Sequence, residues 1–252
     1  MIGVPAAALA LLEAAALAGL AAQALAWRRA LRLWDAGGPW PGRAEEPSPL
    51  PGPRCWILVA ARDEATRLAP LLQALEPARQ AGARLVWVDD GSQDDGPERL
   101  RVELTQRGWT GATVLERPAR GKPQALADGL DAVLVRAGGG DAVLFTDADT
   151  RPRSGWLSAH AAALAGADLA CGRVLLQVGG GTERQRRRRQ FESAVSDLQC
   201  ALGCCGGQPR FARGANWSAR VEALRRVDAP DILRRLASGD DVHVVRALAA
   251  AG

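Results

Sequence analysis

Short apolar runs alternate with helical stripes along most of the chain after residue 54. The runs have the length of buried strands and lie at residues 56–61, 84–88, 112–115 and 142–145. Apolar residues recur at helical spacing between them, as in Leu68, Leu71, Leu72 and Leu75. Further helices are predicted from about residue 97 and over residues 124–135. Strands that alternate with helices form right-handed βαβ units, so the pattern predicts an α/β fold with a mainly parallel sheet.

The pattern is looser after residue 157. The elements still expected there are strands at 169–178 and 211–218 and helices at 185–202, 221–227 and from 238 onward. Ser238 and Asp240 are suited to cap the last helix, because their side chains can accept from its first free N–H groups.

An alanine-rich apolar stretch covers residues 4–26 and is interrupted by Glu13 and Gln23. As a helix it would be about 34 Å long, enough for a hydrocarbon core of about 30 Å. A charged Glu13 opposes insertion and would need protonation or a partner helix. Tryptophans and arginines follow directly, which is typical of the cytoplasmic edge of a membrane span. We therefore expect a membrane anchor over residues 1–34, with a soluble or surface-lying helix as the alternative.

Composition adds little to this division of the chain. Gly, Pro and Glu without periodicity mark residues 35–53 as a linker, and the folded domain is expected over residues 54–252. The hydrophobic fraction of 48% and charged fraction of 24% are ordinary for a globular protein, and a net charge of +4 does not demand nucleic acid. The arginine run at 184–189 lacks interleaved aromatic residues, so no nucleic-acid partner is expected. Beside a membrane this run could instead meet anionic lipid.

The chain has 5 cysteines, too few and too scattered for a disulfide framework. Cys200, Cys204 and Cys205 cluster in the sequence, but neither histidine is near them. Reduced, buried cysteines are therefore favoured over a zinc site.

Asp147-Ala148-Asp149 follows the apolar run at 142–145, so its carboxylates lie at the carboxyl end of a predicted strand. Ligands of open α/β sheets bind in the crevice outside these strand ends. Two carboxylates at this spacing can hold a hard divalent ion against phosphate oxygens. The alternative is an acidic turn that caps the next helix.

Two further motifs also stand at the ends of predicted elements, one after a strand and one at the start of a helix. Asp89-Asp90-Gly91-Ser92 closes the second strand, where a carboxylate can accept from a base or ribose, although the motif is also good turn chemistry. Lys122, the only lysine in the chain, stands beside a helix N-terminus. The helix dipole disfavours a cation there unless a phosphate binds at the same place, which favours a phosphate-binding role.

The motifs together resemble those of family 2 glycosyltransferases with the GT-A fold, in order and approximate spacing, from about residue 55 to the end. They are Ala60-Ala61-Arg62-Asp63-Glu64, Val88-Asp89-Asp90-Gly91-Ser92, Gly121-Lys122, Thr146-Asp147-Ala148-Asp149, Gly214-Ala215-Asn216 and Ser238-Gly239-Asp240-Asp241. The resemblance implies a Rossmann-like domain that binds a nucleotide-diphospho-sugar.

The resemblance also implies roles on the donor side. The implied donor-binding residues are Ala61, Arg62, Glu64, Asp89, Asp90, Lys122 and Asp147. Either Asp89 or Asp90 corresponds to the aspartate that binds the nucleoside. Asp149 would hold Mg2+ or Mn2+ with Asp147 nearby, and Lys122 would lie near the donor's phosphates. The expected donor is a UDP- or GDP-sugar.

On the acceptor side, the resemblance implies that Gly214, Ala215 and Asn216 shape the loop beside the acceptor. Asp241 corresponds to the catalytic base, with Asp240 standing where glutamate is usual. Transfer would then be a single displacement that inverts the anomeric centre, in the manner of a hexosyltransferase.

The predicted anchor suggests a lipid or polysaccharide acceptor of the cell envelope, with the catalytic domain on the cytoplasmic side of the inner or plasma membrane. No Gln-X-X-Arg-Trp motif follows Asp241, so we expect that C-terminal membrane helices are missing from this chain. One alternative is a sugar-nucleotide nucleotidyltransferase, but residues 60–64 contain no glycine for a phosphate loop. A second is a membrane-tethered binding module without turnover, which should have lost the metal carboxylates or the base.

Overall fold

The computed structural model describes residues 54–177 and 179–252. The predicted anchor over residues 1–34 and the linker over residues 35–53 lie outside the described residues and stay predictions. Within the described part, no helix is long and apolar enough to cross a membrane.

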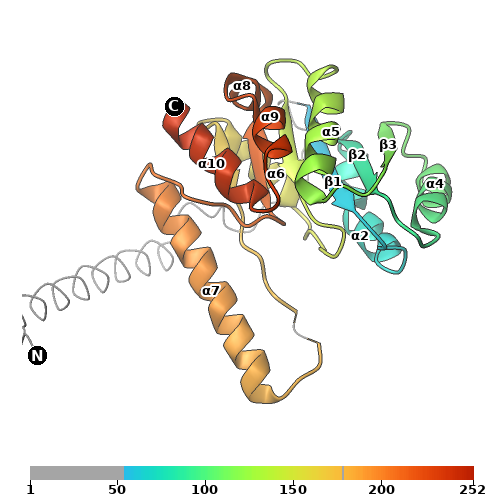
Figure 1. Ribbon diagram of the computed structural model, residues 1–252, viewed down its shortest axis with the longest axis horizontal. Coiled ribbons are helices and arrows are strands. Elements are labelled where there is room, and N and C mark those ends of the chain that lie inside the picture. The colour runs from blue at the N-terminus through green and yellow to red at the C-terminus, as the bar shows by residue number, and fades with distance from the viewer. Residues whose placement is uncertain (1–53, 178) are drawn as a thin grey trace, which may run out of the picture. The chain divides into compact units, whose positions relative to one another are not determined.

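The described part of the chain is built on a 6-stranded sheet of order β3-β2-β1-β4-β6-β5 (Figure 1). Its strands are β1 (Cys55–Ala61), β2 (Arg84–Asp90), β3 (Ala112–Arg117), β4 (Ala142–Phe145), β5 (Leu169–Cys171) and β6 (Trp217–Arg220). β1 pairs in parallel with β2 and β4, whereas β6 runs antiparallel to both β4 and β5. The predicted α/β fold with a mainly parallel sheet is confirmed.

Helices cover both faces of this sheet. α5 (Lys122–Leu134), α8 (Val221–Arg226), α9 (Ala229–Arg234) and α10 (Asp240–Ala251) share one apolar core with the sheet. α2 (Leu68–Ala74), α3 (Glu76–Gln80), α4 (Gly96–Gln106) and α6 (Trp156–Leu164) share the other. In β1, Trp56 and Leu58 enter the first core while Ile57 and Val59 enter the second, which explains why the strand is apolar throughout.

α5 lies unusually close to the sheet because of Gly129. A Cβ atom at this position would lie 2.4 Å from Leu58 Cδ1 and 2.7 Å from Val88 Cγ2. Only glycine allows this approach, since protein interiors are close-packed. The close packing fixes α5 against β1 and β2, and with it the first turn of α5, where Lys122 stands.

The predicted elements after residue 157 needed correction. The strand expected at 169–178 ends at Cys171, because the chain beyond it bonds to a helix instead of the sheet: Val174 N–H donates to Asp197 Oδ1 at 3.2 Å, and the Val174 carbonyl accepts from Ser193 Oγ at 3.1 Å. Only Trp217–Arg220 of the segment expected at 211–218 is a strand. α6 and α9 were not predicted, because the first is almost uniformly apolar and the second is very short.

Two helix ends also differ from the prediction. Neither Ser238 nor Asp240 caps α10, which begins after Gly239 in a left-handed conformation with φ of 79°. α7 (Glu183–Cys205) begins earlier than residue 185, because Thr182 and Gln185 form a capping box. The amino-terminal half of α7 extends away from the sheet (Figure 1).

Candidate active site

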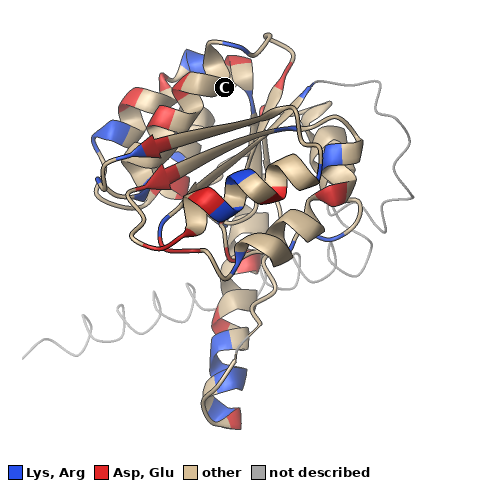
Figure 2. Cartoon of the chain, turned by 90° about the vertical axis from the view of Figure 1, so that its right-hand side faces the viewer, with Lys and Arg blue, Asp and Glu red and all other residues tan. Residues whose placement is uncertain are grey.

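The candidate active site lies at the carboxyl edge of the parallel strands. β1, β2 and β4 end there, and the strand order changes direction between β1 and β4. In open α/β sheets this switch point is where ligands bind. Acidic residues stand at the strand ends (Figure 2). The predicted motifs after these strands are thus brought to one edge.

The loops after β1 and β2 are tied together by side chains. Asp63 N–H donates to Ser92 Oγ at 2.9 Å, and Gln93 N–H donates to Asp63 Oδ1 at 2.7 Å. Ser92 in turn donates its hydroxyl and its N–H to the Asp89 carboxylate. Asp63 has a φ of 55°, a left-handed conformation that aspartate tolerates better than most residues. The sequence analysis included Asp63 and Ser92 in its motifs but gave neither residue a role of its own.

Asp90 holds the turn that precedes α5. Its two carboxylate oxygens accept from Arg120 N–H at 2.8 Å and Gly121 N–H at 2.9 Å. Asp89 and Asp90 are both buried, and both carboxylates hold neighbouring loop residues. A direct contact of either one with a nucleoside stays a prediction, whereas their role in positioning the loops is evident.

Lys122 joins the Asp147 motif to the last helix. Its Nζ donates to Asp147 Oδ1 at 2.6 Å and lies 4.0 Å from Asp240 Oδ2. Burial lowers the pKa of Lys122, but Asp147, Asp240 and Asp241 together outweigh this effect and raise it. Lys122 therefore stays charged at neutral pH. Among the described residues, Asp240 Oδ2 is a buried oxygen that accepts no hydrogen bond.

Asp241 lies against the loop that was predicted to shape the acceptor side. Ala212 N–H donates to the Asp241 carbonyl at 3.2 Å, and a Cβ at Gly214 would lie 3.5 Å from Asp241 Oδ2. Burial and repulsion from Asp240 raise the pKa of Asp241, although its own N–H, Lys122 and Gly214 N–H oppose the rise. A carboxylate with a raised pKa is better matched to accept a proton from a hydroxyl group.

Asn216 is held in place by three hydrogen bonds. Its Oδ1 accepts from Trp156 Nε1 at 2.8 Å and from His160 Nε2 at 2.8 Å, and its Nδ2 donates to the Arg173 carbonyl at 2.6 Å. Because Asn216 Oδ1 can only accept, His160 Nε2 carries the proton, and Nδ1 accepts from Ser218 Oγ at 2.7 Å. Sequence reasoning missed Trp156 and His160. The only signal was a histidine inside an otherwise apolar stretch.

The charged side chains of the loop after β1 interact with residues close to them in the sequence. Glu64 accepts from Arg67 through both carboxylate oxygens, at 2.7 and 2.6 Å, and this hydrogen bonding raises the pKa of Arg67. Arg62 is exposed and lies 3.6 Å from Asp63, whereas Ala61 is buried at the end of β1. The predicted donor contacts of Ala61, Arg62 and Glu64 stay predictions.

The donor set at Asp147 and Asp149 fits a hard divalent cation. Lys122 occupies one oxygen of Asp147, and the exposed Asp149 side chain makes no hydrogen bond or ion pair with the described residues. Carboxylate oxygens are the ligands that Mg2+ and Mn2+ prefer, and these ions also take phosphate oxygens and water. The two aspartates would therefore hold such an ion together with a phosphate-containing ligand.

The sequence matches the family model described as "Glycosyl transferase family 2" over residues 56–227, more than half of the chain. Comparison with curated proteins finds no match.

Solved structures share the fold. The mannosyltransferase PcManGT from Pyrobaculum calidifontis, in complex with GDP-Man and Mn2+, is 22% identical with a TM-score of 0.58, over 89% of this chain and 61% of that one. TarS from S. aureus is 16% identical with a TM-score of 0.51, over 77% of this chain and 55% of that one. GalNAc-T7, with UDP, GalNAc and Mn2+, is 13% identical with a TM-score of 0.54, over 79% of this chain and 41% of that one. The predicted GT-A fold is confirmed, and the chain spans less than two thirds of each of these three structures.

Proposed function

The chain belongs to glycosyl transferase family 2, and we propose that it moves a sugar from a nucleotide-diphospho-sugar to a hydroxyl group of a lipid or glycan acceptor. The observation that carries this proposal is the convergence of Lys122, Asp147, Asp240 and Asp241 at the sheet edge. GDP-Man in PcManGT and UDP in GalNAc-T7 support a nucleotide-sugar donor.

On the donor side, Asp147 and Asp149 would hold Mg2+ or Mn2+, as the Mn2+ in two structural neighbours suggests. The ion would offset the negative charge that develops on the leaving nucleoside diphosphate. Lys122 adds a charged ammonium group at the start of α5, where the helix N-terminus also favours an anion. The turn that carries Lys122 is positioned by Asp90, so Asp90 orients the phosphate side of the site.

On the acceptor side, Asp241 is the proposed base. Its carboxylate would take the proton of the acceptor hydroxyl as that oxygen attacks the anomeric carbon, while the bond to the diphosphate breaks. The sugar would pass through an oxocarbenium-like state and leave with inverted configuration. Gly214 leaves room beside Asp241, and the locked Asn216 fixes the loop that borders this space.

The proposed acceptor class and the proposed location of the enzyme rest on the exposed basic and apolar side chains of α7. Arg187 and Arg188 on α7 have side chains that are 78% and 79% exposed, and Phe191 beside them is 70% exposed. Basic residues near an apolar side chain suit the headgroup region of an anionic membrane. Together with the predicted anchor, this supports a membrane-associated enzyme of the cell envelope, with its catalytic domain on the cytoplasmic side.

The test is a panel of UDP- and GDP-sugars with Mn2+, read by thermal shift and by release of nucleoside diphosphate in the presence of candidate acceptors. We expect a matching donor to raise the melting temperature of the full chain. Asp149→Ala should abolish the shift, because it removes an oxygen ligand of the ion. Asp241→Asn should keep the shift and lower transfer at least about a hundredfold, the contribution typical of a general base.

Asp168→Asn is the matched control, because Asp168 precedes β5 at the opposite edge of the sheet and should change neither readout. An unchanged shift in Asp149→Ala would remove that residue from the metal site. Retained transfer in Asp241→Asn would refute the base. A donor shift with no transfer to any acceptor would favour a binding module.

A further inference from the structure

The carboxyl-terminal half of α7 buries an unusual set of side chains against the domain. Its buried residues are Ser193, Asp197, Leu198 and Cys200. Ser193, Asp197 and Cys200 recur at helical spacing, and Cys204 follows one turn after Cys200. An ordinary packing face would be apolar at these positions. The composition of this stripe therefore calls for an explanation beyond core packing.

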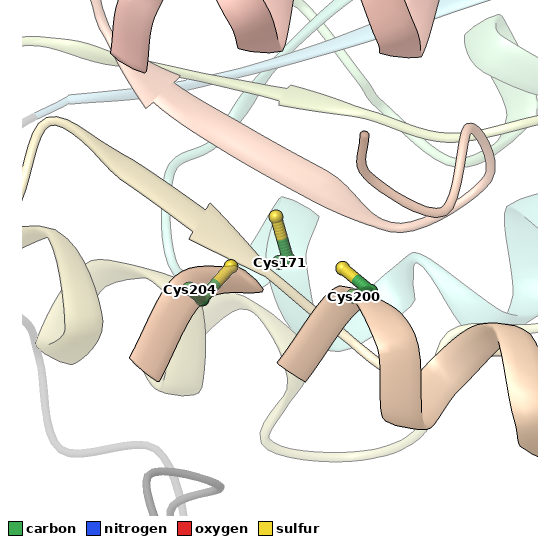
Figure 3. A group of neighbouring side chains, drawn as sticks. All are labelled: Cys171, Cys200 and Cys204. Atoms are coloured by element: carbon green, nitrogen blue, oxygen red, sulfur yellow. The ribbon is translucent and has the colours of Figure 1, made fainter. Parts of the chain in front are cut away.

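Three thiols meet at the end of this stripe. The Sγ atoms of Cys171, Cys200 and Cys204 all lie within 4.8 Å of one another. Cys171 is the last residue of β5, and the other two come from successive turns of α7 (Figure 3). In a tetrahedral zinc–thiolate site the sulfur atoms are about 3.8 Å apart, since each Zn–S bond is about 2.3 Å. Small side-chain movements would therefore bring these thiols into ligand positions.

We propose that Cys171, Cys200 and Cys204 bind a thiophilic divalent ion, with Zn2+ as the expected metal. Each thiol would lose its proton on binding, and the fourth position would be left for water or another ligand. The site differs in chemistry from the carboxylate pair Asp147 and Asp149, because soft sulfur ligands select zinc whereas carboxylates select Mg2+ or Mn2+.

The surroundings suit such a site. Three thiolates and a divalent ion carry a net negative charge. Arg173 lies two residues after Cys171, and Arg213 lies 3.3 Å from Asp197, one helical turn before Cys200. Cys204 is exposed, so an ion has a path from solvent. Charge and access therefore both permit binding.

The position of the cluster also indicates what the ion would do. Cys200 Sγ lies 3.5 Å from the Phe211 carbonyl, and Gly172 N–H, next to Cys171, donates to the Asn216 carbonyl at 2.8 Å. An ion there would join α7 and β5 beside the loop that leads to Gly214. Zinc would thus stabilise the acceptor side of the site without taking part in the transfer.

The first test measures bound zinc in the full chain, purified under reducing conditions and equilibrated with Zn2+ in excess Mg2+. We expect stoichiometric zinc in the wild type after dialysis, and background zinc in Cys204→Ser. Because Cys204 is exposed, this variant should still fold. Cys205→Ser is the matched control, since Cys205 is the exposed next residue and lies outside the cluster. Asp149→Ala should also keep its zinc.

The second test replaces zinc with Co2+. Wild type and Cys205→Ser should show the sulfur-to-cobalt charge-transfer band, and Cys204→Ser should lose it. A chelator should lower the melting temperature of the wild type but leave Cys204→Ser unchanged. Absence of zinc in the wild type, equal zinc in Cys204→Ser, or a disulfide that includes Cys171 in the reduced preparation would overturn the proposal. None of these readouts uses a sugar nucleotide, so failure here leaves the proposed transferase activity untouched.

Discussion

Lys122, Asp240 and Asp241 form a set of charges in which Asp240 raises the pKa of both Lys122 and Asp241. Burial and Asp240 raise the pKa of Asp241, while Lys122 lowers it. Asp240 in turn raises the pKa of Lys122. Asp240 therefore has two effects, because it keeps Lys122 charged for the phosphates and makes Asp241 a stronger base. Glutamate is usual at this position in the family that the sequence resembles, and it would carry the same charge.

Replacing Asp240 by asparagine should extend activity to lower pH. The base works only when it is deprotonated, and its raised pKa sets the acid limit of the reaction. Asp240→Asn removes a charge that raises this pKa, so the pKa of Asp241 should fall and the acid limb of kcat/KM should move down. The measurement is a pH–rate profile of both proteins. An acid limb that stays in place, or that moves up, would contradict the coupling of these two residues.

At the scale of elements, the packing of α6 against β6 depends on buried polar groups. His160 lies on α6 and bonds to Asn216 and Ser218, which lie just before and within β6. Burial lowers the pKa of His160, although its hydrogen bond to Asn216 opposes this. The ring is therefore neutral in the folded protein, donating through Nε2 and accepting through Nδ1.

Acid should destabilise the fold through His160. The unfolded chain binds a proton at the ordinary pKa of 6.5, whereas the folded chain does so only at lower pH. Stability should therefore fall as the pH drops below about 6.5 and level off below the folded-state pKa. Urea unfolding over this range is the measurement. His160→Gln should be less stable at neutral pH, by about 1–3 kcal/mol for lost buried hydrogen bonds, but less sensitive to acid.

His243→Gln is the matched control, because His243 is the other histidine of the chain and is exposed. Its stability should follow that of the wild type at every pH. If His160→Gln kept the full acid sensitivity, another group would be responsible.

The elements also show what the sequence could and could not predict. The strand at 142–145 and the stripe at Leu68 and Leu71 were predicted because local periodicity is strong there. The start of β5 at residue 169 was also predicted, but its end at Cys171 could not be, because the chain beyond it bonds to side chains of α7. The Asp147 motif was placed correctly at a strand end, whereas the approach of Cys171 to α7 depends on tertiary packing that leaves no local pattern.

At the scale of the molecule, α7 is the most prominent departure from a compact domain. Its amino-terminal half extends from the body and is rich in arginine (Figure 2). Phe191, Leu175 and Leu176 leave apolar side chains exposed in the same region of the sequence. Burying such side chains in a headgroup layer would be favourable, and anionic lipid would attract the arginines.

A chain of residues 54–252 should therefore float with phosphatidylglycerol vesicles at low salt and release as salt rises. Replacing Arg187 and Arg188 by glutamine should weaken partitioning about thirtyfold, given about 1 kcal/mol for each of the two basic residues near an anionic surface. Arg99→Gln with Arg235→Gln is the matched control, since each of these exposed side chains pairs with an aspartate four residues earlier, outside α7. Equal loss in the two double variants would point to net charge rather than α7.

The side-chain hydrogen bonds between the loops after β1 and β2 affect how these loops can open. Asp63 N–H and Gln93 N–H are each protected by a side chain of the opposite loop, and Ser92 is bonded to Asp89. Neither loop can open without breaking bonds to the other, so their amide protons should exchange with solvent as one cooperative unit. A ligand that contacts only one of these loops would then slow exchange in both.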